Sequence, residues 1–84
     1  MPDDKVSYLN RGYTYIGMGD YATALKDIEK SLELNPEYLG AIAYKGIILT
    51  NTGRADEGIQ WMTRAIDMQP DNPAFYYYLS LIHI

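Results

Sequence analysis

The chain has 84 residues, of which 48% are hydrophobic; its formal net charge is -4, and it contains no cysteine. This length allows one domain with a small core, and this hydrophobic fraction is typical of a folded chain. The absence of cysteine excludes disulfides and thiolate metal sites, so packing alone must hold the core together. The acidic balance argues against a nucleic-acid partner, and the scattered basic residues form no cluster that would attract an anionic membrane.

The two ends of the sequence carry no clear targeting or membrane signal. The first residues, MPDDKVSY, are acidic and polar, unlike a signal peptide. The final apolar run of about a dozen residues is too short to span a bilayer. The sequence therefore predicts a soluble, cytoplasmic chain with no membrane association.

The first half of the chain predicts two helices. Helical spacing of apolar residues runs over Asp4–Met18, and Gly19 suits the left-handed residue that closes a helix. Asp20 is a suitable N-terminal cap for a second helix over Tyr21–Leu34. Pro36 then prevents that helix from continuing.

The second half repeats this order and adds one more helix. Helices are expected over Glu37–Thr52 and Ala55–Met68, with Gly53 between them. Asn72-Pro73 is a strong start signal for a fifth helix, which is apolar on all sides. Because short connections make neighbouring helices antiparallel, and no strand pattern competes, the expected fold is all-α with five helices.

An internal repeat underlies this organisation. Three pairs of landmarks recur at one interval of 34 residues, namely Gly12 and Gly46, Gly19 and Gly53, and Pro36 and Pro70. Chance is a poor explanation for three pairs that share one period. Such a period is the signature of a helical repeat array.

At this point the chain resembles the tetratricopeptide repeat family, whose pattern is W-x2-L-G-x2-Y, then A-x3-F, then P. The first unit reads Tyr8-x2-Arg11-Gly12-x2-Tyr15, Ala24-x3-Ile28 and Pro36. The second unit reads Ile42-x2-Lys45-Gly46-x2-Leu49, Gly58-x3-Met62 and Pro70, and the third begins Tyr76-x2-Leu79-Ser80-x2-His83. The resemblance implies a right-handed solenoid of antiparallel helix pairs. It would form a single domain over residues 1–84, with repeats at about 5–38 and 39–72 and a half repeat at 73–84.

The departures from the family pattern are tolerable. Arg11 and Lys45 stand at the leucine position, where their stems can lie along an apolar surface with the charge in water. Gly58 should cost its helix roughly 1 kcal/mol relative to alanine. Gly12 and Gly46 are interpreted as places where two helices approach closely.

No group of residues predicts an enzyme, a metal site or a cofactor site. His83, the single histidine, stands at a helix-packing position of the repeat. The charged run from Lys26 to Glu33, including Asp27, reads as a solvated helix face. Trp61 is expected to be half-buried packing rather than a binding anchor.

The first helix of each unit carries a second stripe beside its packing stripe. Its positions contain no charged residue, and in the three units they are Val6, Leu9, Tyr13 and Ile16; Gly40, Ala43, Ile47 and Thr50; and Ala74, Tyr77, Leu81 and Ile84. In the resembled family these positions line the concave groove that takes up an extended or helical peptide. The alternative is that they complete a core between stacked helices.

This stripe predicts a non-enzymatic protein-interaction scaffold that binds an apolar or amphipathic segment. The predicted groove residues are Val6, Leu9, Tyr13, Ile16, Ala43, Tyr44, Ile47, Tyr77, Tyr78 and Leu81. The family's best-known groove clamps a C-terminal carboxylate with Lys, Asn and Arg. Those positions here hold Leu9, Tyr13, Tyr44, Ala74 and Tyr78, so no carboxylate-clamp ligand is expected.

Self-assembly is the alternative function. Repeat arrays need polar caps for solubility, and the apolar fifth helix needs a cover that a second copy could supply by groove docking or helix swapping. The candidate residues for self-association are Phe75, Tyr77, Leu81, Ile82 and Ile84. A longer array from which this chain was excised would leave the same face uncovered, so the identity of the partner stays open.

Overall fold

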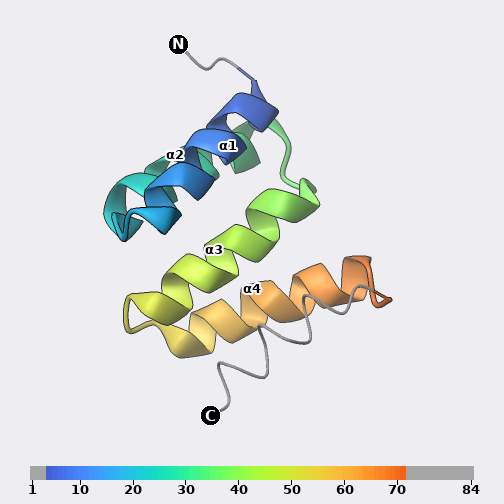
Figure 1. Ribbon diagram of the computed structural model, residues 1–84. Coiled ribbons are helices and arrows are strands. Elements are labelled where there is room, and N and C mark those ends of the chain that lie inside the picture. The colour runs from blue at the N-terminus through green and yellow to red at the C-terminus, as the bar shows by residue number, and fades with distance from the viewer. Residues whose placement is uncertain (1–3, 72–84) are drawn as a thin grey trace.

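The computed structural model describes residues 4–71, which form four helices and, within that range, no strand (Figure 1). The helices are α1 (Lys5–Gly17), α2 (Tyr21–Leu34), α3 (Leu39–Asn51) and α4 (Ala55–Met68). All four correspond to helices predicted from the sequence. The predicted fifth helix and half repeat lie outside the described residues, together with Phe75, Tyr77, Tyr78, Leu81, Ile82, His83 and Ile84.

Helix α3 begins two residues later than the sequence predicted. The side chain of Asn35 accepts a hydrogen bond from the Glu37 backbone amide at 3.1 Å, and the Tyr38 amide donates to the Asn35 carbonyl at 3.1 Å. These bonds close a turn of the kind that asparagine side chains favour. The turn keeps Glu37 out of the helix, which starts at Leu39.

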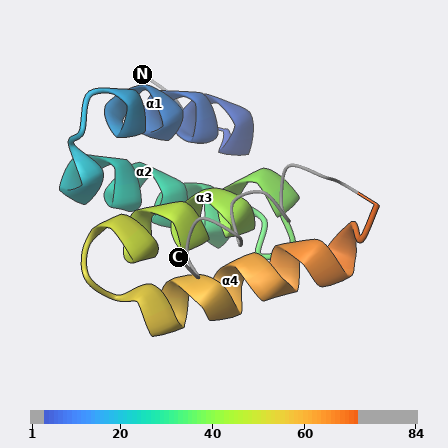
Figure 2. The same ribbon diagram turned by 60° about the horizontal axis from the view of Figure 1, so that its bottom comes forward.

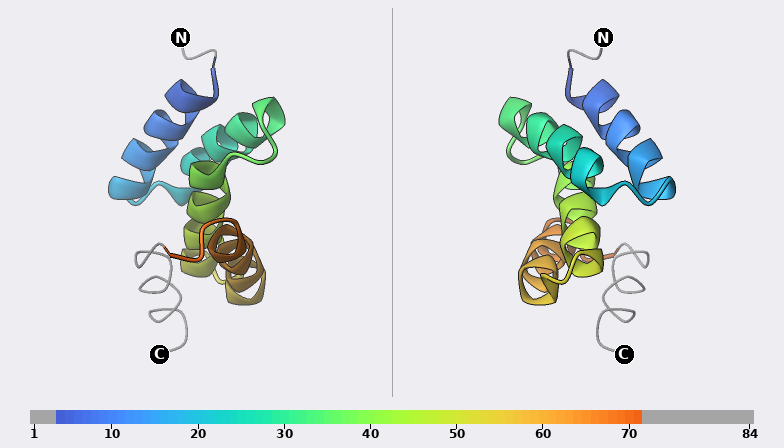
Figure 3. Two further views of the ribbon diagram at one scale, coloured as in Figure 1. Left: turned by 90° about the vertical axis from the view of Figure 1, so that its right-hand side faces the viewer. Right: turned by 90° about the vertical axis from the view of Figure 1, so that its left-hand side faces the viewer.

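The helices form two antiparallel pairs, α1 with α2 and α3 with α4, and α2 packs on α3 to join the pairs. Figures 1 and 2 show the α1–α2 turn and the α3–α4 turn at the same end of the molecule, so α1 and α3 run in the same direction. The side views in Figure 3 show α2 between α1 and the second pair. No helix within residues 4–71 is long and apolar enough to cross a membrane.

The turns and caps follow the sequence signals. Gly19 and Gly53 have φ of 79° and 84°, the left-handed conformation expected at a helix end. The Asp20 carboxylate accepts from the Thr23 amide at 3.2 Å, and the Asp4 carboxylate accepts from the Ser7 amide at 2.7 Å. The hydrogen bond from Ser7 lowers the pKa of Asp4, because it favours the charged carboxylate.

Each pair is tightened by glycine. A Cβ on Gly12 would lie 2.7 Å from Cδ1 of Ile28, and one on Gly46 would lie 3.0 Å from the carbonyl oxygen of Gly58. Both predicted close approaches are therefore confirmed. A Cβ on Gly58 would lie 2.7 Å from the Gly46 carbonyl oxygen and 2.9 Å from the Thr50 amide nitrogen. Gly58 is thus more than a weak helix residue, because it lets α4 approach the backbone of α3.

The charge at Asp27 corrects a sequence-based expectation. Instead of facing water, this side chain is buried, with a residue exposure of 5%. It receives two hydrogen bonds from the Arg11 guanidinium, at 2.8 Å from Nε and 2.7 Å from Nη2. The bidentate pair raises the pKa of Arg11 above its ordinary value. Arg11 therefore fastens α1 to α2 rather than only lying along an apolar surface.

The second repeat solves the same contact with different chemistry. Lys45 and Trp61 occupy the positions 34 residues after Arg11 and Asp27. Nζ of Lys45 lies 4.4 Å from the centroid of the Trp61 ring, and it also pairs with Glu29 of α2 at 3.6 Å. A salt bridge in one repeat is thus replaced by a cation–π contact in the next. Trp61 is half-buried, as the sequence predicted.

We expect Asp27→Asn to lower the melting temperature by about 5–10 °C, because it removes a buried bidentate charge pair. Thermal unfolding followed by circular dichroism at 222 nm would measure the shift. Glu29→Gln is the matched control, since its longer and exposed pair with Lys45 should contribute almost nothing. Equal melting temperatures for both variants would contradict this role of Asp27.

Candidate functional site

The candidate site is a pocket on the face shared by α1 and α3. It has a volume of about 250 Å³ and is lined by Tyr13, Ile16, Gly17, Tyr44 and Ile47. The Tyr13 and Tyr44 rings contact each other, with centroids 5.4 Å apart and planes tilted by 40°. Two helices from different repeats therefore build one small, mostly apolar depression.

The structure brings together four of the predicted groove residues, Tyr13, Ile16, Tyr44 and Ile47, in this pocket. Tyr13 is 57% exposed, which leaves a large part of its ring available to a partner. Ile16 and Tyr44 pack at their bases on the core of the first repeat, whereas Ile47 packs on the core of the second. The pocket thus has firmly supported walls.

The rest of the uncharged stripe divides between surface and core. Val6 is 47% exposed on α1, one turn and more before the pocket. Leu9 is half-buried and packs on Gly40, where a Cβ would lie 2.9 Å from Leu9 Cδ2. The small residue at position 40 therefore lets α1 and α3 approach, and Leu9 mainly serves that contact.

Ala43 is a correction to the predicted groove. Its exposure is 4%, and it belongs to a buried cluster with Ile42, Met62, Ala65 and Ile66. The residue in the next turn, Thr50, likewise faces α4, since a Cβ on Gly58 would clash with it. Along α3 the alternative of a core between stacked helices therefore holds at these two positions.

No charge lines the pocket. Helices α1 and α3 contain three basic residues and no acidic residue, and each basic side chain is engaged elsewhere. Lys5 lies over the Tyr38 ring at 5.6 Å, Arg11 pairs with Asp27, and Lys45 lies over Trp61. The pocket can offer van der Waals contact, aromatic faces and tyrosine hydroxyls, but no side-chain ion.

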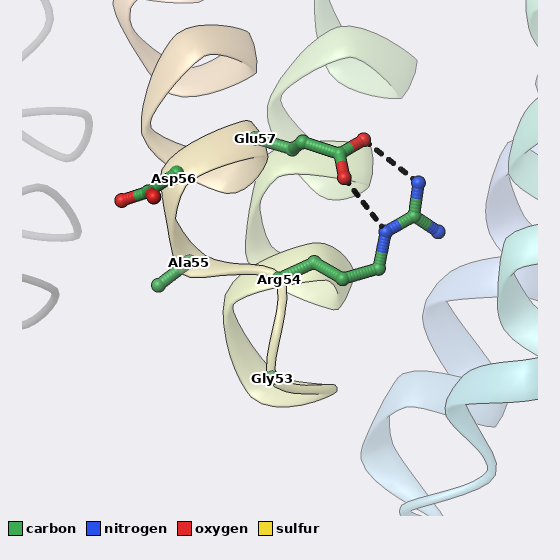
Figure 4. Close-up of a pocket in the computed structure, with 5 residues that line it drawn as sticks. All are labelled: Gly53, Arg54, Ala55, Asp56 and Glu57. Atoms are coloured by element: carbon green, nitrogen blue, oxygen red, sulfur yellow. Dashed lines mark hydrogen bonds and ion pairs between the residues drawn. The ribbon is translucent and has the colours of Figure 1, made fainter.

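A second hollow of about 360 Å³ lies at the α3–α4 turn, and its lining residues are Gly53, Arg54, Ala55, Asp56 and Glu57 (Figure 4). Arg54 is already paired with Glu57, at 3.0 Å from Nε and 2.7 Å from Nη2. This pair lowers the pKa of Glu57 because the guanidinium stabilises the carboxylate. Asp56 points away from the pair, so no side chains converge here.

Among residues 4–71, no three acidic or histidine side chains are placed to hold a metal ion. The geometry also offers no nucleophile beside a base in that range. The chemistry available to this part of the chain is therefore recognition by contact.

Two sequence segments match the tetratricopeptide repeat family, residues 6–38 and residues 45–72. The chain belongs to the tetratricopeptide repeat family. Its first repeat is the α1–α2 pair and its second is the α3–α4 pair. The repeat alternation of the fold and the two matched segments thus agree.

The chain is similar to parts of much longer repeat proteins. It is 48% identical over 46 residues to the human protein SGT1 homolog, a match over 55% of this chain and 13% of that protein. It is 38% identical over 64 residues to human tetratricopeptide repeat protein 13, covering 76% and 7%. It is 30% identical over 71 residues to Hsp70-Hsp90 organizing protein 2 of Arabidopsis thaliana, covering 84% and 12%. The chain therefore spans only a small part of each relative.

Sequence reasoning missed Gly17 as a lining residue of the site. It sits outside the charge-free stripe, and the sequence marks it only as part of the Gly17-Met18-Gly19 helix exit. The signal that could have found it is its helical position one turn after Tyr13, next to Ile16. Only the approach of α3 reveals that this position borders a pocket.

Proposed function

We propose that this chain is a non-enzymatic protein-interaction module that binds an apolar or amphipathic segment of a partner in the groove between α1 and α3. The observation that carries the proposal is the uncharged pocket between Tyr13 and Ile47. Membership of the repeat family and the similarity to longer repeat proteins support an interaction scaffold. An amphipathic helix laid into such a groove is read through apolar anchors at helical spacing.

The chemistry of the pocket favours an apolar ligand over an acidic one. A carboxylate would need a cation or several strong donors, and the basic residues of α1 and α3 are engaged on other helices. Exposed Val6 and Tyr13 extend the apolar face along α1. An exposed apolar surface of this kind marks an interaction site more often than chance would give.

Peptide display on the whole chain, followed by affinity measurement of the enriched peptides, tests the proposal. We expect enriched peptides with bulky apolar residues at helical spacing. Tyr13→Asp should weaken their binding by about tenfold or more, because it places a charge in an apolar contact. Thr14→Asp is the matched control, with the same charge introduced at the adjacent exposed residue of α1.

The proposal fails if Tyr13→Asp and Thr14→Asp bind the enriched peptides as wild type does, while circular dichroism shows both variants folded. A second copy of the chain is the alternative occupant of this face. Light scattering at micromolar concentration separates the two, since a monomer that binds peptide supports the proposal. A stable dimer that excludes peptide would favour self-assembly.

A further inference from the structure

We propose that Gly17 opens the pocket to a partner, and that the pocket takes one bulky apolar side chain whose neighbouring residue in the partner is lysine or arginine. This inference rests on the proposed function and names the chemistry of the segment that would bind. Three observations support it: the environment of Gly17, the size of the pocket and the charge at the ends of α1 and α3.

Gly17 differs from the other glycines in having no structural reason to be glycine. Gly19 and Gly53 have positive φ, which favours glycine. The other four, Gly12, Gly40, Gly46 and Gly58, lie so close to neighbouring atoms that a Cβ would approach one of them to 3.0 Å or less. Gly17 is helical, and a Cβ there would meet nothing within 4 Å.

The open space beside Gly17 is the pocket itself, since Gly17 is one of its lining residues. Glycine is unfavourable in a helix relative to alanine, so an alanine here would stabilise α1. A side chain at this position would, however, project into the space next to Tyr13 and Ile16. We therefore interpret Gly17 as a notch in the wall through which a ligand enters.

The size of the pocket sets the size of its occupant. Pockets for small molecules and cofactors usually measure about 300–1,000 Å³. This pocket, at about 250 Å³, lies below that range and fits a single large side chain. The aliphatic walls of Ile16 and Ile47 and the aromatic faces of Tyr13 and Tyr44 favour a leucine, isoleucine, methionine or phenylalanine.

The charge at this end of the groove selects the neighbour of that anchor. The carbonyl end of a helix carries partial negative charge, and a cation there is favourable. Neither α1 nor α3 has a basic residue in its last turn. Both helices end on the same side of the molecule (Figure 2), so their dipoles act in the same direction. A lysine or arginine beside the anchor would complement these ends.

Three labelled peptides test the charge preference. Each is an amphipathic helix of about four turns, roughly 14 residues, with leucine anchors at helical spacing. They differ only in the residues that flank the anchors, which are lysine, glutamine or glutamate. Fluorescence anisotropy with the whole chain should give a dissociation constant about fivefold lower for the lysine peptide than for the glutamate peptide, with the difference shrinking in 0.5 M salt.

Two variants test the notch. Gly17→Leu fills the pocket without a clash and should weaken the lysine peptide by about tenfold or more. Thr63→Leu, an equal addition at an exposed site on α4, should stay within about twofold of wild type. Full binding by Gly17→Leu overturns the assignment of the pocket. Equal binding of the three peptides overturns the charge preference alone, and if none binds to a chain that does bind display-selected peptides, the stated partner chemistry is wrong while the proposed function stands.

Discussion

Gly58→Ala should destabilise the chain by about 2–3 kcal/mol, although alanine is the better helix former. The added methyl would lie 2.7 Å from the Gly46 carbonyl oxygen and 2.9 Å from the Thr50 amide nitrogen. Because these neighbours are backbone atoms, they can give way only if α3 and α4 move apart. That movement would loosen the core around Met62, which is fully buried between the two helices.

Urea unfolding followed by circular dichroism would measure this free energy. Gly17→Ala is the matched control, because it makes the same substitution in a helix where nothing lies within 4 Å. It should be neutral or stabilise the chain by up to about 1 kcal/mol. Stabilisation by both variants would show that helix propensity outweighs the close approach at Gly58, and would contradict the packing described for the second repeat.

Ile28→Ala should lower the free energy of unfolding by about 2–5 kcal/mol. Ile28 is fully buried and fills the space that Gly12 leaves on α1. With a glycine opposite, no neighbouring side chain can move in to fill the cavity. An 84-residue domain has a total stability of about 4–13 kcal/mol, so this loss is a large part of it.

The same urea titration measures this effect, with Leu34→Ala as the control on the same helix. Leu34 is 50% exposed near the end of α2, so truncating it should cost less than about 1 kcal/mol. A loss at Ile28 no larger than the loss at Leu34 would mean that the α1–α2 interface is not packed as described.

The helices and turns were largely predictable because their signals are local. Asp20 caps α2 through a hydrogen bond three residues away, and Gly19 adopts the left-handed conformation that ends α1. The 34-residue period then aligned these signals into two helix pairs. The late start of α3 is the exception, since the Asn35 side chain closes its own turn with Glu37.

What the sequence did not predict depends on contacts between segments far apart in the chain. Asp27 looked solvated within its charged run, and only Arg11 on α1 makes its burial favourable. Ala43 looked like a groove residue, but it belongs to the core against α4. The pocket beside Gly17 arises because two repeats meet there, so no pattern within one helix could indicate it.

The most direct measurement of the proposed function is an NMR titration of the whole, ¹⁵N-labelled chain with a display-selected peptide. The account predicts that the largest amide shifts occur at the residues of the pocket, namely Tyr13, Ile16, Gly17, Tyr44 and Ile47. Trp61 and Arg64, which contact each other on α4 and do not line the pocket, should shift little. Large shifts at Trp61 and Arg64 with an unchanged pocket would contradict the account.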